Sequence, residues 1–175
     1  MLVGLTLFLL VLDQVSKWLV RQNLAFGEMW APIPALSRFF TFTHVQNTGV
    51  AFGQMPGLGW LFLLVNVGVV AGILVYYSRL PEGQWLSRVA SALILTGALG
   101  NMIDRVRTTY LALPVAGNIW NALPFAYVTD FVDIKFWPVW NVADMCVVGG
   151  VAILAWTLWR DERAAKAREA MANDQ

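Results

Sequence analysis

Residues 2–20 read LVGLTLFLLVLDQVSKWLV, and this stretch decides the class of fold. A helix of about 20 mostly apolar residues is long enough to cross the hydrocarbon core of a bilayer. No basic region precedes the apolar run, and no small-residue cleavage site follows it, so we interpret the stretch as a retained membrane helix rather than a cleaved signal peptide. The chain is therefore expected to be an integral membrane protein.

Three further stretches have the length and apolarity of membrane helices, namely residues 58–77, 88–105 and 138–159. The composition agrees, because 58% of the 175 residues are hydrophobic and only 13% are charged, whereas soluble domains carry about 25% charged residues. We therefore expect a single membrane-embedded domain over residues 1–175. The net charge of +1 gives no electrostatic reason to expect a nucleic-acid partner.

The distribution of basic residues predicts how the spans are oriented. Arg79 and Arg88 flank the connection between the second and third spans. Four basic residues crowd the C-terminal tail 160–175: Arg160, Arg163, Lys166 and Arg168. Short loops rich in Lys and Arg remain in the cytoplasm. Both termini are therefore expected inside, with the tail cytoplasmic and the loops 21–57 and 106–137 on the outer side.

Both outer loops carry signs of secondary structure. Residues 38–47, RFFTFTHVQN, alternate imperfectly between apolar and polar side chains, which is typical of a strand, and Asn47-Thr-Gly49 is a turn signal. The loop 106–137 is rich in Tyr, Trp and Pro, and it has room for a short helix and a second strand. The sequence thus predicts four transmembrane helices with some β-structure outside the membrane.

Ionisable side chains within membrane helices are costly and indicate function by default. Asp13 and Lys17 lie four residues apart in the outer half of the first span, so they share a helix face and can pair. Gly97, Asn101 and Arg105 repeat at the same spacing in the third span, where the glycine allows another backbone to approach closely. Topology brings these groups to one level near the outer surface, where they either form a site or tie the helices together.

Asp130 and Asp144 form a more specific pair, because no basic residue lies within one helical turn of either. If the two carboxyls meet, their repulsion favours a state in which they share one proton. One of them can then activate a water that attacks a peptide carbonyl, while the other protonates the carbonyl oxygen and later helps the amine leave. This is the chemistry of an aspartic protease, and because such a pair titrates as a unit, neither residue is assigned as the acid.

Five short motifs occur in order along nearly the whole membrane core. They are Asp13-Gln-Val-Ser-Lys17, Asn47-Thr-Gly-Val-Ala-Phe52, Gly97-Ala-Leu-Gly-Asn-Met-Ile-Asp-Arg105, Val128-Thr-Asp-Phe131 and Asn141-Val-Ala-Asp144. Together they resemble the motifs of the bacterial lipoprotein signal peptidases, also called signal peptidase II. Each motif alone is weak, but each stands where the topology requires polar groups.

The resemblance implies an all-α membrane protein with four transmembrane helices, a small extracytoplasmic β-platform and a short extracytoplasmic helix. It implies an aspartic endopeptidase that removes the signal peptide of diacylglyceryl-modified prolipoproteins by cutting before the lipidated cysteine, with Asp130 and Asp144 as the catalytic pair. Supporting or substrate-contacting roles carry over to ten further residues: Asp13, Lys17, Asn47, Gly49, Ala51, Gly97, Asn101, Arg105, Asn141 and Ala143. No metal or other cofactor is expected.

The resemblance also implies a multi-pass protein of the bacterial cytoplasmic (inner) membrane, with the active site near the outer leaflet. The expected partners are the lipid-modified prolipoprotein and membrane lipid, without nucleic acid or metal, and we expect a monomer. Two features depart from the family pattern. The stretch between Arg105 and Asp130 is longer than expected, and Trp140 replaces the usual Phe before Asn141.

Two other classes of function stay open. A proton-coupled small membrane transporter would also use intramembrane charges, although these charges gather at one edge and no internal repeat is visible. A non-catalytic scaffold would explain the four helices but not the two unpaired carboxylates. Structural or surface roles are expected for Asp104, His44 and Cys146, a solvated loop position for Asp133, and an interhelical hydrogen bond for Asn66.

Overall fold

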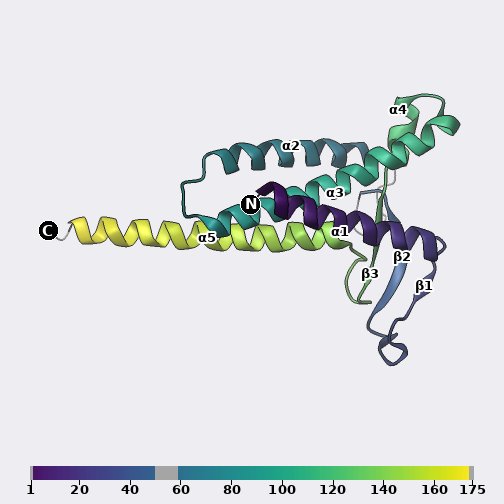
Figure 1. Ribbon diagram of the computed structural model, residues 1–175, viewed down its shortest axis with the longest axis horizontal. Coiled ribbons are helices and arrows are strands. Elements are labelled where there is room, and N and C mark those ends of the chain that lie inside the picture. Colours follow the sequence, from purple (N-terminus) through teal and green to yellow (C-terminus); the bar gives the residue numbers. More distant parts are fainter. Residues whose placement is uncertain (1, 50–58, 174–175) are drawn as a thin grey trace.

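A computed structural model describes residues 2–49 and 59–173 of the protein. Four long helices run along one axis, and a small sheet lies at the end away from the C-terminus (Figure 1). The helices are α1 (Leu2–Asn23), α2 (Gly59–Ser78), α3 (Trp85–Ala116) and α5 (Val142–Asn173). Each contains a window long and apolar enough to cross a membrane, so the expected fold class is confirmed.

The central helix of the bundle is α3, which packs against α1, α2 and α5. Small side chains allow this packing, since Ala90, Ala92 and Ala98 are buried and a Cβ placed on Gly150 of α5 would lie 2.9 Å from the carbonyl oxygen of Ala90. Lipid is as apolar as the side chains, so membrane helices associate through such close contacts rather than through a hydrophobic driving force. By contrast, α2 buries almost none of its side chains, as expected for a helix that faces lipid.

Two helices differ at their ends from the spans expected from sequence. Instead of ending at residue 105, α3 continues to Ala116, after which Gly117 adopts the left-handed conformation that commonly caps a helix. The start of α5 is at Val142 rather than at residue 138. Trp140 instead pairs with Val132 of the sheet, which holds the chain before Asn141 in an extended conformation.

The sheet is antiparallel, and its strands in spatial order are β1 (Met29–Trp30), β2 (Thr41–Asn47) and β3 (Val128–Asp133). A bulge interrupts the register of β2 with β3 between Phe42 and Val45. The extra residue explains why apolar and polar side chains alternate only imperfectly along β2. A short helix, α4 (Ile119–Ala122), and a 3-10 turn, η3 (Leu123–Phe125), precede β3, so a small sheet and a short helix are both present, as expected.

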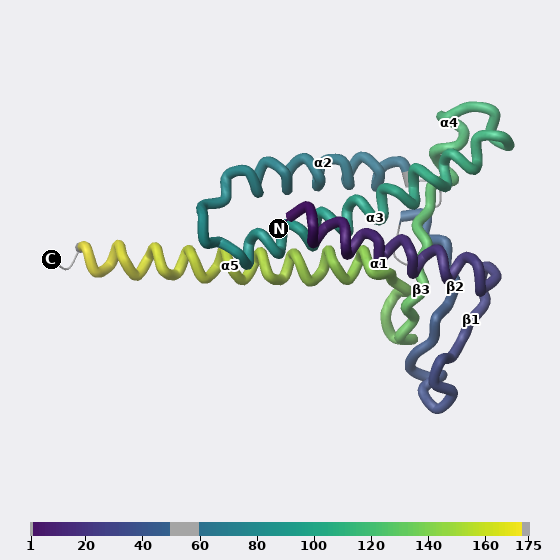
Figure 2. The backbone as a smooth tube through the Cα atoms, in the orientation of Figure 1, coloured from purple at the N-terminus to yellow at the C-terminus, as the bar shows by residue number. Residues whose placement is uncertain are grey.

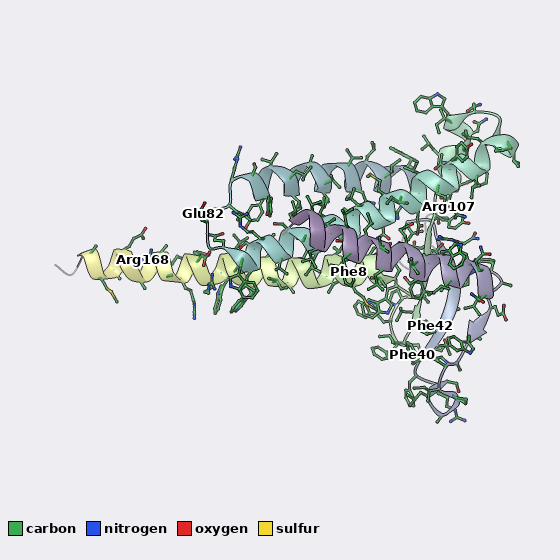
Figure 3. The ribbon with its side chains drawn as sticks, in the orientation of Figure 1. Phe8, Phe40, Phe42, Glu82, Arg107 and Arg168 are labelled. Carbon is green, nitrogen blue, oxygen red and sulfur yellow. The ribbon has the colours of Figure 1, made fainter. Side chains whose placement is uncertain are left out.

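The sheet lies beside the end of the helical bundle that is away from the C-terminus (Figure 2). Its third strand packs against both α1 and α3. Phe40 and Phe42 mark the sheet, whereas Glu82 and Arg168 lie toward the opposite end of the molecule (Figure 3). This arrangement brings β3 to the level at which the polar residues of the helices gather.

Candidate active site

Two carboxyl groups from different elements meet through one asparagine. Asp130 lies in the middle of β3, and Asp144 lies in the first turn of α5. The side-chain amide of Asn141 donates to Asp130 Oδ1 at 2.6 Å, and its backbone N–H donates to Asp144 Oδ2 at 3.2 Å. Asp130 is only 1% exposed, whereas Asp144 is partly exposed. The structure thus brings together, through Asn141, the two residues that the sequence paired.

Asn141 and Asp144 also define the start of α5. Asn141 Oδ1 accepts a hydrogen bond from the backbone N–H of Asp144 at 3.0 Å, while the Asp144 carboxylate accepts from the backbone N–H of Asn141. This reciprocal pattern is a capping box, in which the N-cap residue and the third helical residue satisfy each other's N–H groups. The same contacts that begin the helix therefore orient the Asp144 carboxylate.

A buried charge cluster supports α5 from the side of α1. Lys17, which is 0% exposed, lies 2.9 Å from Asp13 Oδ2 and 3.1 Å from Asp104 Oδ2, so the predicted pairing of Asp13 with Lys17 is confirmed. The other Asp13 oxygen accepts from the backbone N–H of Ala143 at 2.8 Å, which satisfies one of the free N–H groups of the α5 terminus. Buried charges require such pairing, because an isolated ion loses much of its solvation energy in a low-dielectric interior.

Asn101 links this charge cluster to the two carboxyls. Its Oδ1 accepts from the Lys17 ammonium at 3.1 Å and from the Asn141 amide at 3.2 Å, and its Nδ2 donates to Asp144 Oδ1 at 2.8 Å. An ammonium group can only donate, so Lys17 determines which end of the Asn101 amide faces it. The N–H end of Asn101 is consequently presented to Asp144.

Two glycines of α3 make room for these contacts. A Cβ on Gly97 would lie 2.5 Å from the carbonyl oxygen of Ala143, and a Cβ on Gly100 would lie 2.6 Å from Asp13 Oδ2. The close approach expected at Gly97 is therefore confirmed. Gly100 was missed as a site residue because it lies outside the four-residue repeat, and the only signal for it was a second glycine within the same motif.

The last residue of β2 supplies a further hydrogen bond to Asp130. Asn47 Nδ2 donates to Asp130 Oδ2 at 2.8 Å, and Asn47 Oδ1 accepts from the Gly49 N–H at 2.9 Å. Gly49 has a φ of 123°, which residues with a Cβ rarely adopt, and a Cβ there would collide with the ring of Phe62. The predicted turn glycine is confirmed, whereas Ala51 lies outside the described residues.

Arg105 is buried beside the same group of residues. Its guanidinium lies over the ring of Phe62 at 5.4 Å and donates to the backbone oxygen of Asn101 at 3.5 Å. Within the described part of the chain, Arg105 Nε has no hydrogen-bond partner. The neighbouring Asp104 turns toward α1 and accepts from the backbone N–H of Thr129 at 3.2 Å, so it makes the expected contact with backbone.

The surroundings of Asp130 favour its protonated form. Burial raises the pKa of this carboxyl from 3.8 to about 7, and the charge of Asp144 acts in the same direction. The hydrogen bonds from Asn47 and Asn141 oppose the rise. A carboxyl with a pKa near neutrality can both hold and release a proton under ordinary conditions, which is the property that acid–base catalysis requires.

Polar residues away from this site have structural surroundings. His44 Nδ1 lies 2.9 Å from a backbone oxygen just after α1, and Cys146 is buried; no three His, Cys, Asp or Glu side chains among the described residues are grouped to hold a metal ion. Asp133 lies within β3 and pairs with Lys135 at 2.6 Å, so the expectation of a solvated loop charge is wrong. Asn66 Nδ2 has no partner in residues 2–49 and 59–173, so its expected interhelical bond is not found there.

The sequence and the fold match known proteins over most of their length. The family described as signal peptidase (SPase) II matches residues 5–160. The lipoprotein signal peptidase of Halothermothrix orenii is 38% identical, covering 90% of this chain and 94% of the relative, and that of Moorella thermoacetica is 41% identical, covering 88% and 89%. Two solved bacterial membrane enzymes have TM-scores of 0.75 and 0.73 at 25% and 26% identity, covering 92% and 91% of this chain and 88% and 93% of theirs.

Proposed function

Since the chain belongs to the signal peptidase II family of membrane proteases, which remove signal peptides from prolipoproteins, we propose that it cuts diacylglyceryl-modified prolipoproteins before the lipidated cysteine. Asp130 and Asp144 are the catalytic pair in this proposal. The observation that carries the choice is Asn141, which hydrogen-bonds to both carboxyls and so keeps them adjacent. Two adjacent carboxyls in a buried site favour a single shared proton.

In the proposed reaction, the pair of carboxyls transfers protons in two successive steps. The ionised carboxyl takes a proton from water as the water oxygen bonds to the scissile carbonyl carbon, and the protonated carboxyl gives its proton to the carbonyl oxygen. The resulting diol then returns one proton to the pair, the C–N bond breaks, and the leaving nitrogen receives the other proton. The pair ends with one proton, as it began, and it acts as a unit throughout.

The supporting residues divide by what they contact. The amides of Asn47, Asn101 and Asn141 orient the two carboxyls, and the buried charges and small residues of α1, α3 and α5 hold the start of α5 in place. Arg105 has an Nε donor without a partner among the described residues, which supports a contact with a substrate carbonyl. Ala51 stays a predicted substrate contact.

The proposed orientation places both termini in the cytoplasm and the active site near the outer leaflet. Beyond the basic residues of the tail, support comes from α5, where Arg160 lies over Trp156 at 5.5 Å and Arg163 over Trp159 at 4.4 Å. Trp and Arg concentrate at membrane interfaces, so these pairs suit the cytoplasmic boundary. The 32 residues of α3 measure about 48 Å, enough for a tilted helix to span a bilayer of roughly 40–45 Å including its headgroups.

The partners in this proposal are the lipid-modified prolipoprotein and membrane lipid. The proposal is for a monomer that needs no metal or other cofactor, because the two carboxyls can supply both the acid and the base of the reaction. The acyl chains of the substrate are already in lipid before binding, so they gain little from burial and mainly position the scissile bond.

The test compares a diacylglyceryl-modified precursor peptide with its unlipidated twin. The wild-type protein should cut only the lipidated peptide, and the variants Asp130→Asn and Asp144→Asn should fold and cut neither. Normal processing by either variant would reject the catalytic pair, and equal cutting of both peptides would reject the substrate class. Solute flux into proteoliposomes that depends on Asp144, without any cleavage, would favour a proton-coupled transporter instead.

A further inference from the structure

Arg21 belongs to none of the five motifs, yet it connects α1 to the proposed catalytic strand. It lies one helical turn beyond Lys17, on the same face of α1. Its Nη1 is 3.4 Å from Asp104 Oδ1 and donates to the Thr129 hydroxyl at 3.2 Å. The Arg21 side chain is 13% exposed, so these contacts are largely shielded from solvent.

The first connection from Arg21 leads to Asp130 through β3. Thr129 directly precedes Asp130, and it is held at two points, since its hydroxyl accepts from Arg21 and its backbone N–H donates to Asp104. Arg21 and Asp104 also form an ion pair with each other, so α1, α3 and β3 meet at Thr129. A shift of Thr129 would carry the Asp130 backbone with it.

The second connection from Arg21 leads to Asp144 through α3. Asp104 binds Lys17 through its other carboxylate oxygen at 3.1 Å, and Lys17 donates to Asn101, whose amide donates to Asp144. Arg21 and Lys17 therefore share the Asp104 carboxylate, one on each oxygen. Both proposed catalytic carboxyls are reached from Arg21 by continuous chains of contacts.

We propose that Arg21 is a positioning residue for the cleavage reaction, in that it holds β3 against α1 and α3 at the separation at which Asp130 and Asp144 act together. The inference rests on the proposed catalytic pair. If Arg21 had only a structural role, its replacement would lower the unfolding temperature and the amount of folded protein. Unfolded molecules do not contribute to the assay, so the kcat of each folded molecule would stay the same. A positioning Arg21 affects turnover by molecules that are folded.

The test measures kcat, KM, the pH profile and the unfolding midpoint with the lipidated peptide in lipid vesicles. Arg21→Gln should lower kcat by about 100-fold, because a displacement of about 1 Å at a reacting centre has an effect of this order. Its KM should stay within about twofold of the wild-type value. The alkaline limb of activity should move to higher pH, because weaker hydrogen bonds to Asp130 and one less positive charge both raise the pKa of Asp130. Arg38→Gln, an equal change of charge on an exposed outer loop, should leave all four quantities unchanged.

Two further variants keep the test informative if Arg21→Gln folds poorly. Arg21→Lys keeps the charge but has only a single ammonium group, so it should recover part of kcat. Thr129→Val removes only the hydroxyl acceptor and should lower kcat by about tenfold, the value of one hydrogen bond to a charged group. The double variant Arg21→Gln/Thr129→Val should be no slower than Arg21→Gln alone, because both changes break the same connection.

Wild-type kcat and pH profile in folded Arg21→Gln would overturn the inference, as would losses in the double variant that multiply. Asp144→Asn in the same assay keeps the two hypotheses apart. If Asp144→Asn is inactive while Arg21→Gln is normal, only the role of Arg21 fails. If Asp144→Asn cuts normally, the catalytic pair itself fails.

Discussion

Gly100→Ala should disturb the site by a displacement that the structure specifies. The added Cβ would lie 2.6 Å from Asp13 Oδ2 and 3.1 Å from the Cβ of Ala143. Non-bonded carbon and oxygen atoms rarely approach within about 3 Å, so the Asp13 carboxylate has to move by roughly 0.5 Å or more. That carboxylate accepts the Ala143 N–H at 2.8 Å and pairs with Lys17 at 2.9 Å, so both contacts lengthen.

Two opposing terms set the magnitude of this effect. Overpacking of a well-packed interior costs about 1–3 kcal/mol. Replacing glycine by alanine within a helix returns up to about 1 kcal/mol. We expect Gly100→Ala to lower the free energy of unfolding by about 1–2 kcal/mol, and kcat to fall because Ala143 immediately precedes Asp144. Gly149→Ala is the matched control, since a Cβ there meets no atom within 4 Å, and it should be neutral or slightly stabilising.

The assay combines thermal unfolding with cleavage of the lipidated peptide, and a double-mutant cycle identifies the cause. In an Asp13→Ala background the carboxylate that blocks the new methyl group is gone, so Gly100→Ala should cost much less there than in the wild type. Equal costs in the two backgrounds, or a Gly100→Ala variant as stable and active as Gly149→Ala, would refute this account of the packing.

Three further outcomes are expected. Lys17→Met should destabilise the protein by about 3–5 kcal/mol in chemical unfolding, because it leaves buried carboxylates without their counter-charge, and a loss below about 1 kcal/mol would contradict the buried pairing. The kcat/KM ratio should fall about tenfold per pH unit above pH 7, because the pKa of Asp130 is raised to about 7 and its proton is lost on the alkaline side; a flat profile to pH 9 would argue against a shared proton. Asn141→Ala should lower the free energy of unfolding by about 1 kcal/mol for the lost helix cap and by a further 1–3 kcal/mol, roughly, for the lost donor to Asp130. Asn118→Ala, at the exposed cap of α4, should cost only the roughly 1 kcal/mol of a lost cap. Equal costs of the two variants in thermal unfolding would contradict the role of Asn141 as a donor to Asp130.

Much of the site was visible in the sequence because its signals are local. Asp13 and Lys17 were predicted to pair from their spacing on one helix, and the structure places them 2.9 Å apart. Gly97 was predicted to admit a second backbone, and the neighbouring helix α5 is there. Asp130 and Asp144 were identified as a candidate pair because no basic residue lies near either in sequence.

Contacts between distant segments were not visible in the same way. Asn47 and Asp130 are 83 residues apart, and Asp13 and Ala143 are 130 apart, so no periodicity within one element relates them. The contact of Arg21 with Thr129 spans 108 residues and depends on where β3 comes to rest against α1.

The sequence by itself determined that the chain crosses a membrane four times, because the length of an apolar run and the cost of a charge in lipid are properties of each segment alone. Only the tertiary structure decided that Asn141 contacts both carboxyls, that α3 continues to Ala116, and that Gly100 must lack a side chain. These features follow from how closely two helices approach and from the register of β2 and β3. Both are settled by packing over the whole molecule rather than by any local pattern.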